Sequence, residues 1–152
     1  MVTPDTMTAV YDFKDFTMTW EHTIGIGLGN WQRPHGMAFT GENGTLVLDR
    51  NGWQVFPEKK KIEAVPLQKN IGVGLDLHVR NFLDCIINNT PEKLNADINI
   101  GRNVALVAQM GNIAYRTGEK VFWNDEKQQF STRTANRFIS PEYYNGYTLP
   151  KY

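Results

Sequence analysis

The sequence has 152 residues, a length that suits one domain, and its apolar (41%) and charged (21%) fractions are ordinary for a folded globular chain. Its 16 Lys and Arg residues balance its 16 Asp and Glu residues. Without a basic excess, nucleic acid is not an expected partner. No run of about 18 apolar residues occurs, so we expect no membrane-spanning helix.

The first residues, MVTPDTMTAVYDF, have neither the basic nor the apolar region of a secretory signal peptide. We therefore expect a cytoplasmic location for the chain as given, and any export signal of a longer parent would lie elsewhere. Because a strand pattern begins at once, we expect residues 1–152 to be a single domain of such a parent. Cys85 is the only cysteine, which excludes an internal disulfide.

Apolar and polar residues alternate over the first 23 residues, which predicts two strands joined at Lys14-Asp15. Their apolar side chains share one face. We predict that this face mediates self-association through Tyr11, Phe13, Phe16, Met18 and Trp20.

Two Asn-Gly pairs, Asn43-Gly44 and Asn51-Gly52, separate the next β-type runs. Asn-Gly accepts the positive φ of tight hairpin turns, so the pattern predicts antiparallel strands at 36–40, 45–49 and 53–57. The run KIEAVPLQ predicts a further strand, and Pro66 places it at a sheet edge.

The second half of the chain has helical periodicity. Leu75, Val79, Phe82, Leu83 and Ile86 predict one face of a helix over 75–89. A second helix is predicted over 99–117, with Gly118 just after its end. Its inward positions are expected at Val104, Ala108, Gly111 and Tyr115. KVFW predicts a short strand, and residues 133–152 predict an extended tail.

Strands followed by helices indicate an α+β fold. We expect a mostly antiparallel, open-faced sheet, a meander of five to seven strands, with two helices packed on one face. The uncovered face is either a polar one with residues such as Thr17, Thr19 and Val47, or the aromatic one described above. An aromatic content of 12% favours an apolar face that requires a partner.

GIGLGN, residues 25–30, resembles a phosphate-binding loop but has Asn30 where the dinucleotide fingerprint requires its third glycine. Pro34 and a strand follow, where the fingerprint needs a helix. No cofactor site is therefore predicted in this chain. The three histidines are far apart in sequence, so no metal site is predicted either. Substrate contact is predicted instead for the aromatic and polar residues of this glycine-lined loop, Trp31, Arg33 and His35.

Five collinear segments, TWEH, HGMAFTGENGTLVLDRNGWQVFPE, HVRNFLDCI, GNIAYRTGEKVFWN and SPEYYNGY, span nearly the whole chain. In this order they resemble the C-terminal part of the Gfo/Idh/MocA family of NAD(P)-dependent oxidoreductases, in its bacterial branch. The resemblance implies a parent with an N-terminal Rossmann domain that binds NAD(P). It also implies an open antiparallel sheet that shapes the pocket for a small-molecule substrate and builds a homo-oligomer.

The catalytic lysine of that family precedes a proline, whereas Lys59 precedes Lys60 and Lys93 precedes Leu94. Neither lysine carries the role over, so no catalytic residue is expected here and the chain alone is expected to be inactive. Two other hypotheses remain open. One is a self-associating β-sheet module with no enzymatic role, and the other is an independent ligand-binding protein or hydrolase that uses His35.

Overall fold

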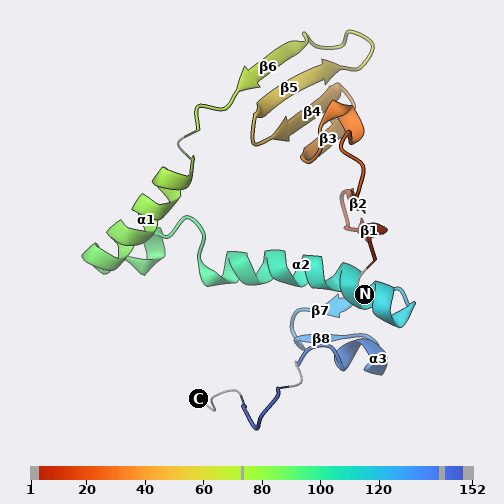
Figure 1. The fold of residues 1–152 in the computed structure, drawn as a ribbon, viewed down its shortest axis with the longest axis vertical. Coiled ribbons are helices and arrows are strands. Elements are labelled where there is room, and N and C mark those ends of the chain that lie inside the picture. The colour runs from red at the N-terminus through yellow and green to blue at the C-terminus, as the bar shows by residue number, and fades with distance from the viewer. Residues whose placement is uncertain (1–3, 73, 141–142, 149–152) are drawn as a thin grey trace. The chain divides into compact units, whose positions relative to one another are not determined.

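The computed structural model describes residues 4–72, 74–140 and 143–148. The chain forms two compact units, Met1–Lys93 and Leu94–Tyr152. Helices and antiparallel sheets are both present, so the predicted α+β class is confirmed (Figure 1). None of the helices in the described ranges is long and apolar enough to cross a membrane.

The first two strands, β1 (Thr6–Asp12) and β2 (Thr17–Thr23), form the predicted antiparallel hairpin. Tyr11 pairs with Met18 across the strands. Phe13 N donates to Phe16 O over 3.0 Å, and the two rings stack with centroids 4.6 Å apart. Antiparallel partners lie on the same face, so the sharing of one face by the predicted aromatic residues is confirmed.

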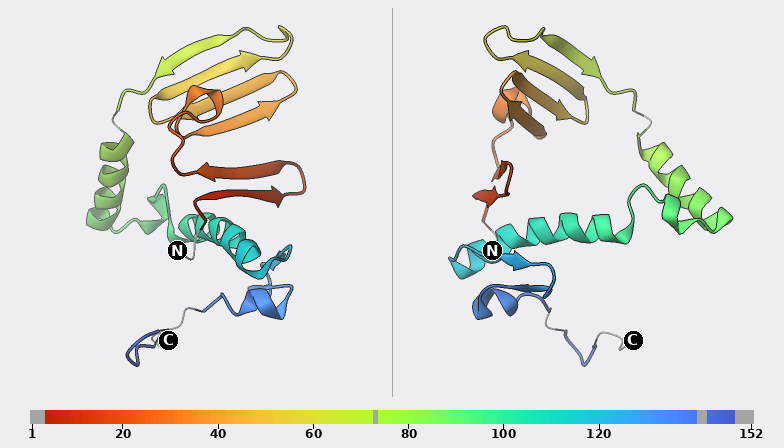
Figure 2. Two further views of the ribbon diagram at one scale, coloured as in Figure 1. Left: turned by 45° about the vertical axis from the view of Figure 1, so that its right-hand side comes forward. Right: turned by 180° about the vertical axis from the view of Figure 1, so that it is seen from behind.

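A second sheet contains β3 (Met37–Gly41), β4 (Gly44–Asp49), β5 (Gly52–Pro57) and β6 (Val65–Lys69), in that order. All four strands were predicted, including β6 at an edge. The single meander of five to seven strands was not correct, because the β1–β2 hairpin forms its own sheet (Figures 1 and 2). Residues 24–36 separate the two sheets, and their four glycines and Pro34 interrupt the strand pattern.

The hairpin turns lie one residue earlier than the Asn-Gly pattern suggests. Gly52 pairs with Asp49 as the first residue of β5, so residues 50–51 make the turn. Gly52 has φ +145°, and a Cβ there would lie 2.0 Å from Gln68 O of the neighbouring β6. The glycine is therefore required by the close approach of β6, in addition to its turn preference.

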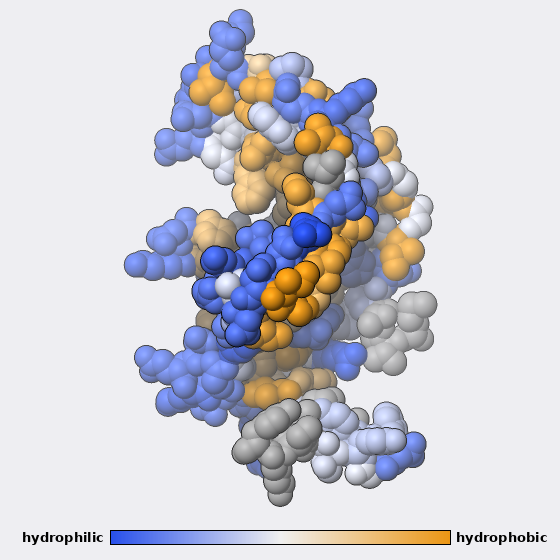
Figure 3. Space-filling view, turned by 90° about the vertical axis from the view of Figure 1, so that its left-hand side faces the viewer, coloured by the Kyte–Doolittle hydropathy of each residue, from blue (hydrophilic) through white to orange (hydrophobic). Residues whose placement is uncertain are grey.

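Helix α1 (Gly74–Asn88) matches the predicted helix within one residue at each end. Of the residues on its predicted apolar face, Leu75, Phe82 and Ile86 are 72%, 52% and 60% exposed. The side of α1 that is buried instead surrounds Cys85, next to the 3-10 turn η2 (Pro91–Lys93). Asn81 Nδ2 donates to Lys93 O over 3.0 Å and holds this turn against the helix. Figure 3, which views the side bearing α1, shows hydrophobic and hydrophilic residues in adjoining bands.

Helix α2 (Ile98–Thr117) also matches the prediction. Asp97 caps its first turn by accepting hydrogen bonds from Asn99 N and Ile100 N. Gly118, with φ +68°, ends it by donating from its N–H to Ala114 O, which confirms the predicted C-terminal glycine.

The core of the second unit differs from the predicted one. Ile113, Phe130 and Ala135 are its buried residues, and partly buried Leu106 and Met110 of α2 pack against them. Gly111 is buried as predicted. The other predicted inward positions, Val104, Ala108 and Tyr115, are exposed. The elements that pack on α2 lie on its Met110–Ile113 side, whereas the predicted positions follow an adjacent stripe of the helix.

After α2 come β7 (Trp123–Asn124), β8 (Gln129–Phe130) and α3 (Arg133–Asn136). The predicted extended tail was therefore wrong at its start, because Thr132 caps α3 by accepting from Ala135 N. Asn136 then pairs with strand β8, accepting from Phe130 N over 2.7 Å and donating to Phe130 O over 2.9 Å. Residues 141–142 and 149–152 of that tail lie outside the described residues.

Candidate functional site

The glycine-rich segment between β2 and β3 contains the predicted substrate residues. It forms one 3-10 turn, η1 (Asn30–Gln32), in which Trp31 and Gln32 have φ of 60° and 58°. Both values lie in the left-handed region, which non-glycine residues rarely adopt, so the two residues store backbone strain. Contacts with surrounding residues have to maintain this conformation. One such contact is the Trp31 ring, whose centroid lies 5.0 Å from that of Phe56 on β5.

Arg33 attaches the same segment to the end of β4. Its Nη1 lies 2.9 Å from Asp49 Oδ1 and donates to Gly52 O over 3.2 Å. The same Asp49 oxygen accepts from Asn51 N over 2.7 Å and from Gly52 N over 3.2 Å. One carboxylate thus organises both the β4–β5 turn and the segment that crosses it.

The charge state of Asp49 follows from these contacts. Burial of the carboxyl by itself raises its pKa, but hydrogen bonds from Asn51 N and from Arg33, with the Arg33 charge and the Gly52 N–H, outweigh it. The pKa of Asp49 is therefore lowered below its ordinary value of 3.8.

The three predicted substrate residues have different surroundings. The guanidinium of Arg33 is directed at Asp49 and Gly52, and its side chain is only 10% exposed. Trp31 is 45% exposed, and His35 is exposed as well. Trp31 and Arg33 thus fasten the segment to the sheet, and substrate contact by any of the three stays a prediction.

Sequence reasoning missed the partners Asp49 and Phe56. Both lie on strands and face the same side of the sheet as buried Val47, two residues from Asp49. The signal was the alternation along β4, which puts Asp49 on the face of Thr45 and Val47. What the alternation could not give is the path of the segment that covers this face.

The opposite face of the four-stranded sheet is apolar and open. The register aligns Leu48 with Trp53 and Leu46 with Val55 on it, and Trp53 is 44% exposed. A hollow of about 690 Å³ lies over this face. Its apolar lining comes from the four residues above and Ile71, and its polar lining includes Lys69 and Asn70. Such a volume is in the range of small-molecule sites.

The hairpin supplies the second apolar surface. Phe16 and Trp20 are 61% and 56% exposed on the face that also includes Met18. Trp20 Nε1 donates to His22 Nδ1 over 3.2 Å, and His22 Nε2 lies 3.2 Å from Pro4 O. With Nδ1 as the acceptor, the proton of neutral His22 is on Nε2, which can donate to Pro4 O. This chain of contacts orients the indole of Trp20 on the face.

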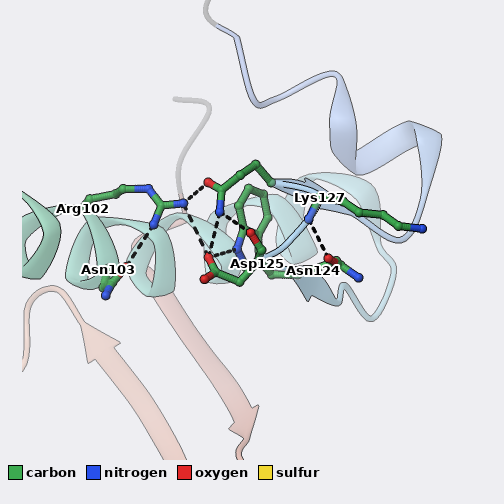
Figure 4. A network of polar contacts seen from close by, with 7 residues as sticks. Arg102, Asn103, Asn124, Asp125 and Lys127 are labelled. Atoms are coloured by element: carbon green, nitrogen blue, oxygen red, sulfur yellow. Dashed lines mark hydrogen bonds and ion pairs between the residues drawn. The ribbon is translucent and has the colours of Figure 1, made fainter.

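The second unit has a polar network at the β7–β8 turn (Figure 4). Asp125 Oδ1 accepts from Trp123 Nε1 over 3.2 Å and lies 3.6 Å from Arg102 Nη2, and Gln128 bonds to both Arg102 and Asp125. The hydrogen bonds from Trp123 and Gln128 and the charge of Arg102 lower the pKa of Asp125 from 3.8, although burial opposes them. The side chains of Arg102, Trp123, Asp125 and Gln128 thus bind one another, which indicates a structural role.

Over the described ranges, no group of three or more His, Cys, Asp or Glu residues is arranged to hold a metal ion. No family model matches the chain, and neither a curated protein nor a solved structure matches it.

Proposed function

We propose that this chain is the substrate-binding and oligomerisation portion of an NAD(P)-dependent oxidoreductase similar to the Gfo/Idh/MocA family. The parent would exchange a hydride between the nicotinamide and a sugar, polyol or related hydroxyl compound. The five collinear segments that resemble the family support this proposal, as does an antiparallel sheet with an open apolar face. An N-terminal Rossmann domain of the parent would supply the cofactor, and this chain would be inactive alone.

The observation that carries the proposal is the aromatic face of the hairpin. Phe16 and Trp20 are more than half exposed on a face that ends in the stacked Phe13–Phe16 pair. Apolar surface gathered on one face of a strand pair favours burial against another protein surface. We infer that a second copy of the chain covers this face through Tyr11, Phe13, Phe16, Met18 and Trp20.

Sedimentation velocity tests the self-association. Phe16→Asp places a charge in the centre of the aromatic face, and we expect it to shift the chain from oligomer to monomer. Thr19→Asp places the same charge on the other face of the same strand and should leave the oligomer intact. If the unsubstituted chain is monomeric, or if the two substitutions have equal effects, this interface is contradicted.

Titration calorimetry with NAD(H) and NADP(H) tests the division of labour with the Rossmann domain. We expect no heat of binding at micromolar cofactor for the isolated chain, because neither GIGLGN nor any other segment has the full fingerprint. Micromolar binding would refute the proposal that cofactor binding belongs to the other domain.

The second candidate function is a self-associating β-sheet module with no enzymatic role. The same exposed hairpin face favours it, so oligomer formation alone cannot separate the two. The two functions can be separated by testing whether the chain binds sugars and polyols. Binding is measured through tryptophan fluorescence of the unmodified chain and of the Trp31→Phe variant. Quenching that is lost in Trp31→Phe supports a substrate portion, whereas no response to any hydroxyl compound favours the module.

A further inference from the structure

The sequence contains the dipeptide Asn-Gly three times, at Asn43-Gly44, Asn51-Gly52 and Asn145-Gly146. In this dipeptide the glycine nitrogen has no neighbouring Cβ to hinder its attack on the asparagine side chain. The three sites share the reacting atoms and differ in how the structure holds the peptide between the two residues.

The peptide at Asn51-Gly52 is held at both of its polar groups. Asn51 O accepts from Asn70 N over 2.9 Å, and Gly52 N donates to Asp49 Oδ1 over 3.2 Å. Gly52 is also buried. The nitrogen is therefore occupied as a donor, and the peptide cannot rotate toward the side chain without local opening.

The peptide at Asn43-Gly44 is held through its carbonyl and its strand. Asn43 O accepts from Glu58 N over 2.9 Å. Gly44 pairs with Gly41 of β3 and with Pro57 of β5, inside the four-stranded sheet. Rotation of this peptide would break the closing pair of the β3–β4 hairpin.

The peptide at Asn145-Gly146 is the exposed one. Asn145 and Gly146 have φ of 59° and 75°, and Tyr147 N donates to Tyr144 O over 3.3 Å, which closes a tight turn around them. The peptide itself makes no hydrogen bond with any residue that the structure describes, and both residues are exposed. Its nitrogen and the Asn145 amide can therefore meet without breaking a strand pair.

We propose that Asn145 is a site of spontaneous succinimide formation and deamidation, and that the fold protects the other two sites. Gly146 N attacks Asn145 Cγ and forms a ring N–Cγ bond, while the Cγ–Nδ2 bond breaks. Nδ2 leaves as ammonia and takes the proton of the Gly146 N–H. Solvent water then adds to one of the two ring carbonyls, the bond from that carbon to the Gly146 nitrogen breaks, and the nitrogen takes a proton from the water. Breakage at Cγ gives aspartate and breakage at the main-chain carbon of residue 145 gives isoaspartate, with no change in oxidation state.

The reaction would change the chemistry of the 143–148 turn. Either product adds a negative charge between Tyr144 and Tyr147, and isoaspartate also lengthens the main chain by one carbon. A longer main chain is incompatible with the Tyr147 N to Tyr144 O bond in its present geometry. The turn would therefore open in the isoaspartate product.

Peptide mapping by mass spectrometry tests the proposal on the full chain, aged in mildly alkaline buffer. Cleavage after Lys and Arg puts Asn43, Asn51 and Asn145 on three different peptides. We expect Asn145 to lose its amide at least about tenfold faster than the other two, since each of those requires prior opening of hydrogen bonds. Equal rates at the three sites, or faster loss at Asn43 or Asn51, would overturn it.

Two controls separate the effect of the structure from that of the sequence. Aging in guanidinium chloride should bring the three rates together, because the protecting contacts are gone. If Asn145 stays much faster in denaturant, neighbouring side chains set the rate and the proposal fails. Gly146→Ala should slow the loss at Asn145 alone, and an unchanged rate would also refute attack by this nitrogen.

Discussion

Arg33 Nη1 and Asp49 Oδ1 lie 2.9 Å apart, with side chains 10% and 3% exposed, and they join the glycine-rich segment to the β4–β5 turn. Because a charge left unpaired in such surroundings is strongly unfavourable, each residue depends on the other. The pair also keeps Trp31 near Phe56, since Arg33 follows Trp31 by two residues.

Replacement of Arg33 should therefore destabilise the fold and release the segment. We expect Arg33→Leu to lower the urea midpoint of unfolding clearly, whereas Arg50→Leu, at an exposed neighbour of the same turn, should leave it nearly unchanged. Equal midpoints for the two variants would contradict the structural role of Arg33.

The same pair predicts a dependence of stability on pH. The folded-state pKa of Asp49 is lowered, so its contribution is fully present above the unfolded-state pKa of about 3.9 and is lost as pH falls through the lower folded value. The free energy of unfolding of the unsubstituted chain should thus decline below about pH 4, and that of Asp49→Asn should decline less steeply. Unfolding in urea across acidic pH measures both. An equally steep decline in Asp49→Asn would show that other carboxylates dominate.

The Asp125 network predicts a spectroscopic signature at Trp123. Protonation of Asp125 weakens its acceptance from Trp123 Nε1, so the indole N–H resonance should shift with an acid midpoint below the ordinary 3.8 of aspartate. NMR titration of the indole N–H measures this midpoint. The pH dependence of this chemical shift should vanish in Asp125→Asn. A Trp123 indole N–H resonance that does not change with pH in the unsubstituted chain would contradict the hydrogen bond.

Asn136 completes strand β8 with its side-chain amide, which accepts from Phe130 N and donates to Phe130 O. Asn136→Ala should lower the free energy of unfolding by about 1–3 kcal/mol, since it leaves Phe130 N and O without partners. Asn136→Asp keeps the acceptor for Phe130 N but loses the donor, so its carboxylate faces Phe130 O. Its loss in free energy of unfolding should shrink in acid, because a protonated carboxyl can donate to Phe130 O. Thr134→Ala, exposed on the same helix, is the control.

Two glycines should respond to alanine in opposite directions. Gly52→Ala is strongly destabilising, because its Cβ would lie 2.0 Å from Gln68 O and the β5–β6 pairing must move. Gly101 is inside α2 with open space around its Cβ position, so Gly101→Ala should stabilise the chain by about 0.5–1 kcal/mol. Thermal unfolding of the two variants gives both signs, and a tolerated Gly52→Ala would contradict the β5–β6 register.

Local patterns were sufficient for most elements of this fold. The alternation in β1 and β2 predicted the face shared by Tyr11 and Trp20, and the periodicity of 99–117 predicted α2 with Gly118 at its end. These features depend on residues that are near one another in sequence. The Thr132 cap of α3 was a signal of the same kind that could have been used.

Features that depend on distant segments were not predictable in this way. Which stripe of α2 is buried depends on Phe130 and Ala135, and whether Arg33 serves a ligand or the fold depends on Asp49. Alternation along β4 places Asp49 on one face of the sheet, but no local pattern marks Asp49, Phe130 or Ala135 as the partner of a distant segment. For the candidate site, the sequence thus located the segment with Trp31, Arg33 and His35 but not the contacts that decide its role.

The two edge strands of the four-stranded sheet, β3 and β6, differ in how readily they can pair with a strand of another molecule. On β6, Pro66 lacks an N–H and Lys69 is charged, which discourages another strand from adding there. On β3, all residues from Met37 to Gly41 are exposed, and the border has neither proline nor charge. Addition of a strand from another molecule to this sheet is therefore favoured at β3 over β6, and Phe39→Lys should oppose it.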